Sequence, residues 1–249
     1  SENKKADFVA NNFSKTLTGM KFGLKASNLT HSIIGTTAMK SLTSTLRTLS
    51  VNKIPKWSPT LPKAITINTN IKTVTSENKV VYFPSCISRT MGQSKQDKEQ
   101  DILFDVTVSL LAKAGYEVII PNDVENLCCG MPFSSKGFTS QANQKSAQLE
   151  ESLNRASNNG EYPILCDTSP CTKKMLESFN GDLKIYEPVE FTLEYLIDKL
   201  EIKKIDEPIL IHSTCSSRKM GLHNKFMQLA NMCSTQVVSP EDVKCCGFA

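Results

Sequence analysis

The sequence predicts an α/β fold with duplicated βαβ-type cysteine-rich domains and parallel sheets, preceded by a helical N-terminal segment, with the second repeat truncated. Two observations carry this prediction. The heptapeptide Cys86-Ile-Ser-Arg-Thr-Met-Gly92 returns as Cys215-Ser-Ser-Arg-Lys-Met-Gly221, with five of seven residues identical. Strand-like apolar runs also alternate with helix-like segments along both copies, which is typical of parallel βαβ units.

The similarity of the two copies extends beyond the heptapeptide. An apolar run that predicts a buried strand precedes each copy, at 80–83 and at 209–211. Downstream, each copy has a Pro-x-Asp-Val segment and then Cys-Cys-Gly, at 128–130 and at 245–247. Two similar units of this length indicate duplicated domains rather than a solenoid. The domains expected are a basic helical segment with a Pro-containing linker at 1–77, a first cysteine-rich domain at 78–205 and the start of a second, incomplete one at 206–249.

Turn residues separate the expected elements. Three prolines and Trp57 predict an extended connector at 54–62, and Gly115 and Gly160 each end a helix. In order, the expected elements are two or three helices within 1–50, broken near Gly19, Gly23 and Gly35; strand 79–84; helix 97–114; strand 116–120; helix 139–158; strand 163–166; helix 172–179; a helix near 189–200; strand 209–211; and helix 222–232.

Composition and charge exclude several classes of protein. The 249 residues are 39% apolar, enough for a packed core, and neither a membrane-spanning run nor a signal peptide is recognisable. We therefore expect a soluble cytoplasmic protein. Residues 1–65 carry ten Lys or Arg against only Glu2 and Asp7. This basic segment is expected to be a helical linker that packs on a neighbouring domain, or else to contact a membrane surface. No recognised module or aromatic interleaving indicates nucleic-acid binding.

Nine cysteines, several of them adjacent, carry the expected chemistry. Adjacent cysteines form only strained, rare disulfides, and the reducing cytosol favours ligation or redox chemistry instead. Ligands of open α/β sheets bind at the carboxyl ends of the strands, so cysteines that follow strands should converge there. These cysteines are Cys86, Cys128, Cys129, Cys166 and Cys171 in the first unit, and Cys215 in the second.

Five cysteines on three loops can supply the four thiolates of a [4Fe–4S] cluster, with one left for a further iron or a substrate sulfur. Structural zinc also takes four thiolates, although the short Cys-x2-Cys knuckles common in zinc sites are absent. A metal-free thiol–disulfide relay is a third alternative. Gly130 is expected to adopt positive φ and to let the backbone approach the inorganic sulfides, while Pro170 is expected to stiffen the last loop.

Four other side chains are candidates with more ordinary alternatives. Arg89 and Arg218, each three residues after a cysteine, can stabilise the negative charge of a cluster or form a salt bridge at a helix start. His212 can ligate or steer protons, or it can make an ordinary hydrogen bond at a strand end. Cys233 has no counterpart in the first unit and is expected to fill space in the core.

These motifs resemble the cysteine-rich CCG domain family, whose pattern is a lone Cys, then Cys-Cys-Gly, then a closing cysteine pair, usually duplicated. The resemblance covers about residues 79–249, and the segments 82–92, 166–171 and 238–249 look most like the C-terminal region of FAD-linked iron–sulfur D-lactate dehydrogenases. Other members include the B-subunit of heterodisulfide reductase and the iron–sulfur subunit of glycolate oxidase. The resemblance places ligands at Cys86, Cys128, Cys129, Cys166 and Cys171 in the first unit and at Cys215, Cys245 and Cys246 in the second.

The resemblance implies an electron relay. In the enzymes it resembles, a flavin takes two electrons as hydride from a 2-hydroxy acid, and iron–sulfur centres pass them singly toward a quinone or cytochrome. No dinucleotide glycine fingerprint or flavin-binding segment is present in this sequence. Substrate oxidation is therefore expected elsewhere. Because the second copy lacks counterparts of Cys166 and Cys171, we expect this chain to be a fragment, with FAD, a flavin domain or subunit and a ferredoxin-like domain in the rest of the parent enzyme.

Several alternatives stay open from the sequence. The closing cysteines of the first unit are separated by four residues rather than the commoner two, so both a cubane and a non-cubane cluster are compatible with the spacing. The alternatives to a D-lactate dehydrogenase are a heterodisulfide reductase- or glycolate oxidase-type subunit and a non-catalytic, zinc-stabilised binding module. The expected location is cytoplasmic, with peripheral contact to the cytoplasmic face of a membrane as an added possibility.

Overall fold

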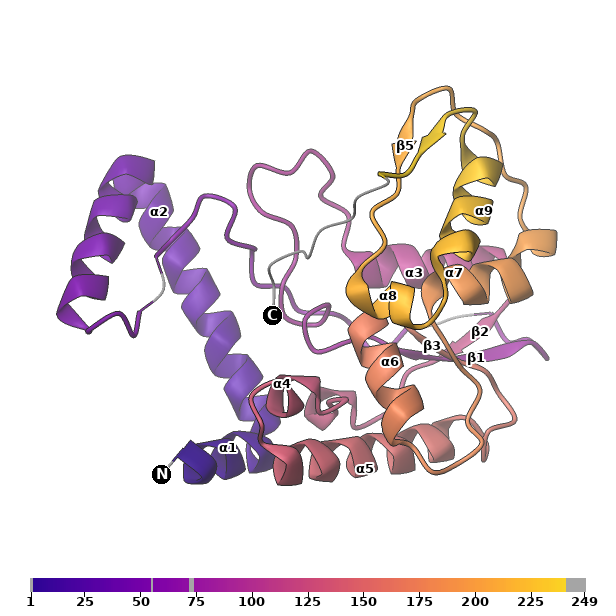
Figure 1. The fold of residues 1–249 in the computed structure, drawn as a ribbon, viewed down its shortest axis with the longest axis horizontal. Helices are drawn as coiled ribbons and strands as arrows, with labels where there is room; N and C mark the ends of the chain where they lie inside the picture. The colour runs from indigo at the N-terminus through magenta and orange to yellow at the C-terminus, as the bar shows by residue number, and fades with distance from the viewer. Residues whose placement is uncertain (1, 55, 72–73, 241–249) are drawn as a thin grey trace.

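The computed structural model describes residues 2–54, 56–71 and 74–240 (Figure 1). Its centre is a four-stranded sheet made of β1 (Lys79–Phe83), β2 (Glu117–Ile119), β3 (Ile164–Cys166) and β4 (Ile185–Tyr186). The strands lie in the order β2-β1-β3-β4, and each neighbouring pair is parallel. The expected α/β class is confirmed, and β4 is a strand that the sequence pattern did not indicate.

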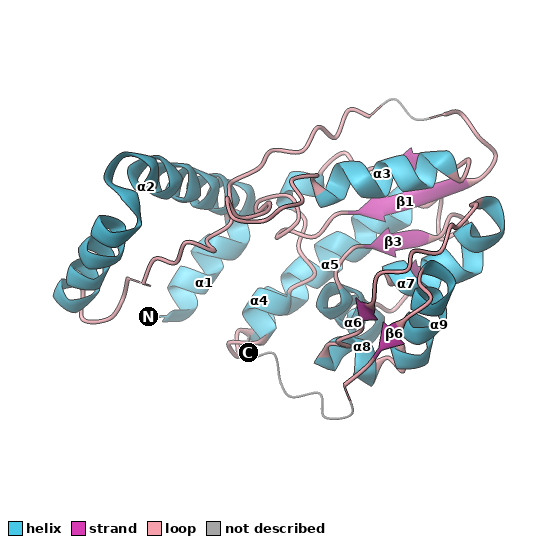
Figure 2. Cartoon of the chain, turned by 90° about the horizontal axis from the view of Figure 1, so that it is seen from above, coloured by secondary structure: helices cyan, strands magenta, loops and turns pink. Residues whose placement is uncertain are grey.

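Helices cover both faces of this sheet (Figure 2). Side chains alternate along β1, so Val81 and Phe83 pack against one helical layer while Val80 and Tyr82 pack against the other. Both faces of the strand are buried, which explains why its sequence is continuously apolar instead of alternating. The first layer contains α5 (Thr139–Ala156) and α6 (Ser169–Ser178), and the second contains α3 (Leu103–Lys113) and α7 (Pro188–Phe191).

The second copy of the repeat forms a βαβ unit of its own. Strand β5 (Ile209–Leu210) pairs in parallel with β6 (Val237–Val238), and α8 (Cys215–Lys219) and α9 (His223–Cys233) connect the two strands. The turn around the cysteine is built alike in both copies. The N–H of Ser88 donates to Ser85 Oγ, and the N–H of Ser217 donates to Thr214 Oγ1, both at 3.2 Å. The repeated heptapeptide is therefore also a repeat of local structure.

The N-terminal segment consists of α1 (Glu2–Asn11) and the long α2 (Phe13–Leu49), which extends away from the sheet (Figure 1). The break expected at Gly35 is confirmed, because its φ of 76° and ψ of 176° interrupt the helical backbone. The breaks expected near Gly19 and Gly23 are wrong, since both residues lie in helix; the cost of about 1 kcal/mol for a helical glycine does not outweigh the buried side chains around them. None of the described helices has the length and apolar content needed to cross a membrane.

The start of α3 differs from the expected start at residue 97. The segment before Leu103 is strongly polar, and its side chains bond to the local backbone instead of extending the helix. Asp97 accepts the N–H of Ser94 at 2.6 Å, and Gln100 donates to the carbonyl of Asp97 at 2.6 Å. Side chains of this kind compete with helix formation when no apolar face can be buried.

Two further helices differ from their expected form. Helix α6 begins at Ser169 and not at 172, so Pro170 lies in a first helical turn, where its missing N–H costs nothing, instead of stiffening a loop. Cys171 therefore also lies in that first turn. The single helix expected near 189–200 is α7 followed by a π-helical segment (Thr192–Leu196) and a 3₁₀ turn (Ile197–Lys199).

Helix α1 and the first turns of α2 pack on the first cysteine-rich unit. Phe13 lies against Phe133 of α4 (Met131–Ser134), with ring centroids 6.4 Å apart, and Gln141 of α5 donates to Asp7 at 2.5 Å. Buried residues of α1, α2, α4 and α5 form one apolar cluster that includes Cys128. The basic segment thus borders the cysteine loops.

We expect Phe13→Ala to lower the free energy of unfolding by about 3 kcal/mol, because it removes a buried ring and leaves a cavity between α2 and α4. The control is Phe22→Ala on the same helix, where the ring is 73% exposed and the change should stay within about 0.5 kcal/mol. Urea unfolding followed by circular dichroism measures both. Equal effects of the two substitutions would contradict this packing.

Candidate metal centre

The cysteine loops meet at the carboxyl ends of the central strands. The strand order reverses between β1 and β3, and in open α/β sheets ligands bind at such a switch point. Cys86 follows the end of β1, Cys166 is the last residue of β3, and Phe83 pairs with Cys166 across the two strands. The structure therefore brings together the loops that the sequence pattern placed at this edge.

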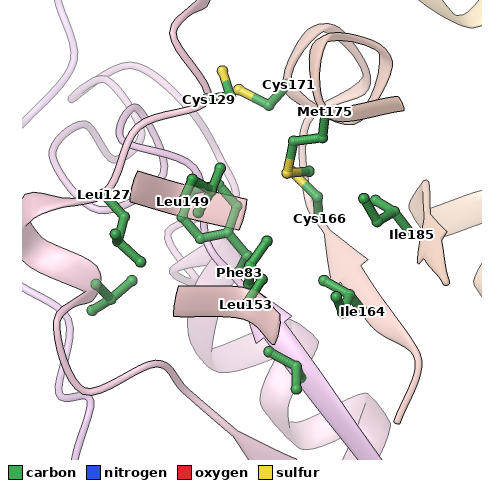
Figure 3. Close-up of a cluster of buried hydrophobic side chains, with 12 residues drawn as sticks. Phe83, Leu127, Cys129, Leu149, Leu153, Ile164, Cys166, Cys171, Met175 and Ile185 are labelled. Atoms are coloured by element: carbon green, nitrogen blue, oxygen red, sulfur yellow. The ribbon is translucent and has the colours of Figure 1, made fainter. Parts of the chain in front are cut away.

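Five thiols form a continuous run at this edge. Each thiol interacts with the next one along the run: Cys86 with Cys128, Cys128 with Cys129, Cys129 with Cys171 and Cys171 with Cys166. Figure 3 shows the sulfurs of Cys129 and Cys171 pointing toward each other. Four of the five residues are buried and Cys86 is half-buried. The five cysteines of the first unit are thus neighbours at one edge of the sheet.

Backbone N–H groups point at three of these sulfurs. Such donors favour the thiolate form of a cysteine, and hydrogen bonds to ligand sulfurs tune the potential of a cluster. The pairs are Ile87 with Cys86, Gly130 with Cys128 at 3.4 Å, and Met131 with Cys129.

Gly130 has the positive φ that the sequence predicts, at 86°. A Cβ atom at this position would lie 2.5 Å from the carbonyl oxygen of Ala142 in α5. The missing side chain therefore faces α5, which adds a packing reason for the glycine to the expected one. Its first role is to let the Cys-Cys-Gly loop turn tightly against the helix that supports it.

Arg89 is fully buried beside the thiols, at 0% exposure. Its guanidinium donates to the carbonyl of Leu127 at 2.8 Å and to that of Val124, so it fixes the loop that leads to Cys128. Its Nε has no hydrogen-bond partner, and no carboxylate of the described residues lies within ion-pair distance. The salt-bridge alternative for Arg89 is therefore not seen, and its positive charge lies next to Cys86 and Cys128.

Lys145 is a second buried cation that the sequence reasoning missed. It is 2% exposed, and its Nζ donates to the carbonyl of Asn126 at 2.7 Å and to Gln148 at 2.8 Å. Its helical spacing could have indicated burial, because Lys145 lies three residues after Ala142 and four before Leu149, on the buried face of α5.

Asp167 is another missed residue, and it joins two cysteine loops. It accepts the N–H of Ser85 at 3.0 Å, the hydroxyl of Tyr82 at 2.9 Å and the hydroxyl of Thr168 at 2.9 Å. These bonds hold the turn before Cys86 against the end of β3. An aspartate in a polar loop gives no sequence signal for this role.

Hydrogen bonds within the run separate the pKa values of the thiols. Bonds from Cys128 and Cys171 lower the pKa of Cys129 to about 5, while the bond to Cys129 raises the pKa of Cys128 to about 12. The bond to Cys128 likewise raises the pKa of Cys86, and the bond to Cys129 raises that of Cys171. In the metal-free protein, negative charge therefore resides on Cys129, in the middle of the run.

We expect the free energy of unfolding of the metal-free, reduced protein to rise with pH from about 5, the lowered pKa of Cys129, to about 8.5, that of an unfolded thiol. Over this range the folded Cys129 has lost its proton while the unfolded thiol keeps it. The contribution is complete above the unfolded pKa and is lost as the pH falls through the folded one. Urea unfolding of the wild type and of Cys129→Ser at several pH values tests this, and an equally steep rise in the variant would contradict it.

The second unit brings together fewer of its predicted residues. Cys215 is exposed at the start of α8, while Cys245 and Cys246 lie outside the described residues. Arg218 is exposed, unlike Arg89. Arg89 donates to the carbonyl of Val124, and the residue equivalent to Val124 in the second copy, Val243, lies outside the described residues. His212 is exposed, and Cys233 is half-buried at the end of α9.

The donor set fits a multinuclear anionic group. Within the described ranges, no three side chains among His, Cys, Asp and Glu are placed to hold one metal ion. The thiols are instead spread along a run, with N–H donors on three sulfurs and two buried cations that lack carboxylate partners. An iron–sulfur cluster bound by thiolates has the sulfur ligands and the negative charge that suit this arrangement.

Comparison with protein families identifies this part of the chain. Residues 80–175, which contain all five cysteines of the run, match the family model of the CCG cysteine-rich domain. The match confirms, for this region, the resemblance that its motifs indicated.

Two curated relatives extend the comparison. The chain is 26% identical over 133 residues to the C-subunit of the anaerobic glycerol-3-phosphate dehydrogenase of Escherichia coli strain K12, and equally to that of Escherichia coli O157:H7. The match covers 49% of this chain and 34% of each relative, so the chain spans about a third of the length of these relatives. No solved structure matches the chain significantly.

Proposed function

We propose that the chain is an iron–sulfur electron-transfer module of a dehydrogenase. The observation that carries the proposal is the continuous run of five thiols beside two buried, unpaired cations at the switch point of the sheet. The CCG domain match and the similarity to a dehydrogenase subunit support the same conclusion. The cluster ligands would come from Cys86, Cys128, Cys129, Cys166 and Cys171.

The bound cluster would supply one-electron transfer. The protein's own groups would set its environment. Burial of Cys128, Cys129 and Cys166 excludes water from the site. The N–H groups that point at the sulfurs lower the basicity of the thiolates, and Arg89 holds the loop before Cys128 while its charge opposes that of the ligands. Five thiols in one run leave one more than a cubane needs, so a cubane with a spare thiol and a non-cubane cluster both agree with the geometry.

The second unit would provide ligands for a separate, second cluster site. The cysteine turn of Cys215 repeats that of Cys86, and α8 lies against α6, where the hydroxyl of Ser217 donates to Ser169 at 3.1 Å. We propose that Cys215 is joined by Cys245 and Cys246 in a second site. The proposed domains are 1–77, 78–205 and 206–249.

For the parent enzyme we propose a flavin-dependent 2-hydroxy-acid oxidoreductase, with D-lactate as the first candidate substrate. The support is the resemblance of the segments 82–92 and 166–171 to that branch of the family. A subunit of the glycolate oxidase or heterodisulfide reductase type is the alternative, and the name of the curated relatives adds glycerol 3-phosphate as a substrate to test. FAD would be bound elsewhere, and a quinone or cytochrome would accept the electrons.

The place of action proposed is the cytoplasm, with peripheral contact to a membrane through the basic N-terminal segment. Phe22, Leu29 and Ile33 are exposed on α2 beside its lysines, which supports such contact. Sedimentation of the protein with anionic lipid vesicles, compared with neutral vesicles, tests the membrane contact.

The function is tested by purifying the tagged chain anaerobically from its native cells together with its partners. We expect flavin in the purified complex and bleaching of the cluster absorbance when D-lactate is added, with glycolate and glycerol 3-phosphate as the comparison substrates. Bleaching by one of the comparison substrates alone would replace D-lactate. A complex whose cluster no substrate reduces, although dithionite reduces it, would contradict the dehydrogenase role.

A further inference from the structure

Two buried cations bind the loop that carries Cys128. Arg89 donates to the carbonyl of Leu127, and Lys145 donates to the carbonyl of Asn126, so the two side chains bind neighbouring residues of one loop. Both are almost fully buried, and Cys128 is an electrostatic neighbour of each.

Neither cation forms an ion pair with a carboxylate of the described residues, although Glu125 and Asp167 lie close enough to favour the charge of Arg89. Ion pairs of the described residues are made by other side chains, for example Lys79 with Glu117 and Lys225 with Glu190. Burial lowers the pKa of Lys145, the thiolate form of Cys128 opposes this shift, and the positive charge of Arg89 adds to it. Two like charges that repel each other inside a protein are costly unless an anion lies beside them.

The contacts of Lys145 show that its position is fixed. Its Nζ makes two hydrogen bonds and lies 5.2 Å from the centre of the Phe13 ring, so α2 closes over it. The long, flexible side chain of a lysine on a surface helix can usually place its ammonium in water. Here the ammonium is bound by the carbonyl of Asn126, two residues before Cys128.

We propose that Lys145 is a positioning residue which, together with Arg89, neutralises the thiolate-bound group and sets its reduction potential. This inference rests on the proposed iron–sulfur function. A positive charge beside the cluster stabilises the reduced state, which is the more negative one, so removal of the charge should make reduction harder. Removal of an exposed lysine should change the reduction potential much less, because water and salt screen exposed charges.

The test is a redox titration of the reconstituted protein, followed by visible absorbance and electron paramagnetic resonance. The variants are Lys145→Gln, which removes the charge, Lys145→Arg, which keeps it, and Lys136→Gln, which removes an exposed charge from the neighbouring loop. We expect a lower midpoint potential for Lys145→Gln and wild-type values for the other two. We also expect chelators to strip the cluster of Lys145→Gln at least about tenfold faster, in the range typical of groups around metal ligands.

The outcomes separate this inference from the function on which it rests. A midpoint potential of Lys145→Gln equal to that of Lys136→Gln would overturn the inference while the iron and sulfide content of the wild type still supports the function. If Lys145→Gln retains no cluster, retention in Lys145→Arg with equal circular dichroism supports the role of charge. Loss of the cluster in both variants with intact secondary structure would show that shape and not charge matters. A wild type without iron and sulfide would overturn both claims.

Discussion

Replacement of Cys129 by Ser is expected to abolish cluster binding at the first site, with at least about tenfold less iron retained than in the wild type. Cys129 is at the centre of the thiol run, with hydrogen bonds to Cys128 on one side and Cys171 on the other. It is also the thiol with the lowered pKa, and the thiolate is the form that binds metal. A serine hydroxyl in its place is a poor ligand for iron and breaks the run into two parts. Cys128→Ser should have a comparable effect.

The control for this experiment is Cys233→Ser. Cys233 is half-buried at the end of α9, in the second unit, so its loss should leave the visible absorbance and the iron content unchanged. All three variants are reconstituted anaerobically with iron and sulfide and compared by absorbance and iron analysis. Full iron content in both Cys128→Ser and Cys129→Ser would show that the vicinal cysteines are not ligands.

Replacement of Gly130 by Ala is expected to lower the free energy of unfolding by about 3 kcal/mol and to impair cluster binding. Two costs combine: an alanine is strained at a φ of 86°, and its Cβ would lie 2.5 Å from a backbone oxygen of α5, which cannot move aside as a flexible side chain can. Relief of that contact requires the Cys-Cys-Gly loop to shift away from α5. The shift would move the Cys128 and Cys129 sulfurs.

Gly137 provides the matched control for Gly130. Its φ is 79°, but nothing lies within 4 Å of the position that a Cβ would take. Gly137→Ala should therefore cost only the conformational strain, about 1 kcal/mol, and should retain the cluster. Urea unfolding and iron content measure both variants. If Gly137→Ala is as destabilising as Gly130→Ala, the close approach to α5 contributes nothing.

The sheet and the place of the cysteines could be predicted from the sequence because both depend on local patterns. A continuously apolar run such as 80–83 indicates a strand buried on both faces, and residues that follow parallel strands must lie at one edge of the sheet. The positive φ of Gly130 was predicted in the same way. Its contact with Ala142 could not be, since it depends on how α5 packs against the loop.

The charges around the site were harder to predict because burial is a property of the whole fold. Arg89 and Arg218 occupy equivalent positions in the repeat, yet the first is buried and the second is exposed. Lys145 has no counterpart in the repeat and lies in a polar helix, so only its spacing from Ala142 and Leu149 marks it as inward-facing. The boundary error at α3 arose where polar residues bond to the local backbone, and the error at α6 arose because Pro170 lies in its first turn.

The proposed function depends above all on whether the five cysteines of the first unit hold an iron–sulfur cluster. The content of iron, acid-labile sulfide and zinc in the chain after anaerobic reconstitution, with Cys129→Ser as the reference, decides this. For a cubane cluster we predict roughly four iron and four sulfide ions in the first site of each chain, and both should be lost in the variant. A non-cubane cluster would have a different iron-to-sulfide ratio. Stoichiometric zinc without acid-labile sulfide would contradict the iron–sulfur assignment and favour a zinc-stabilised module.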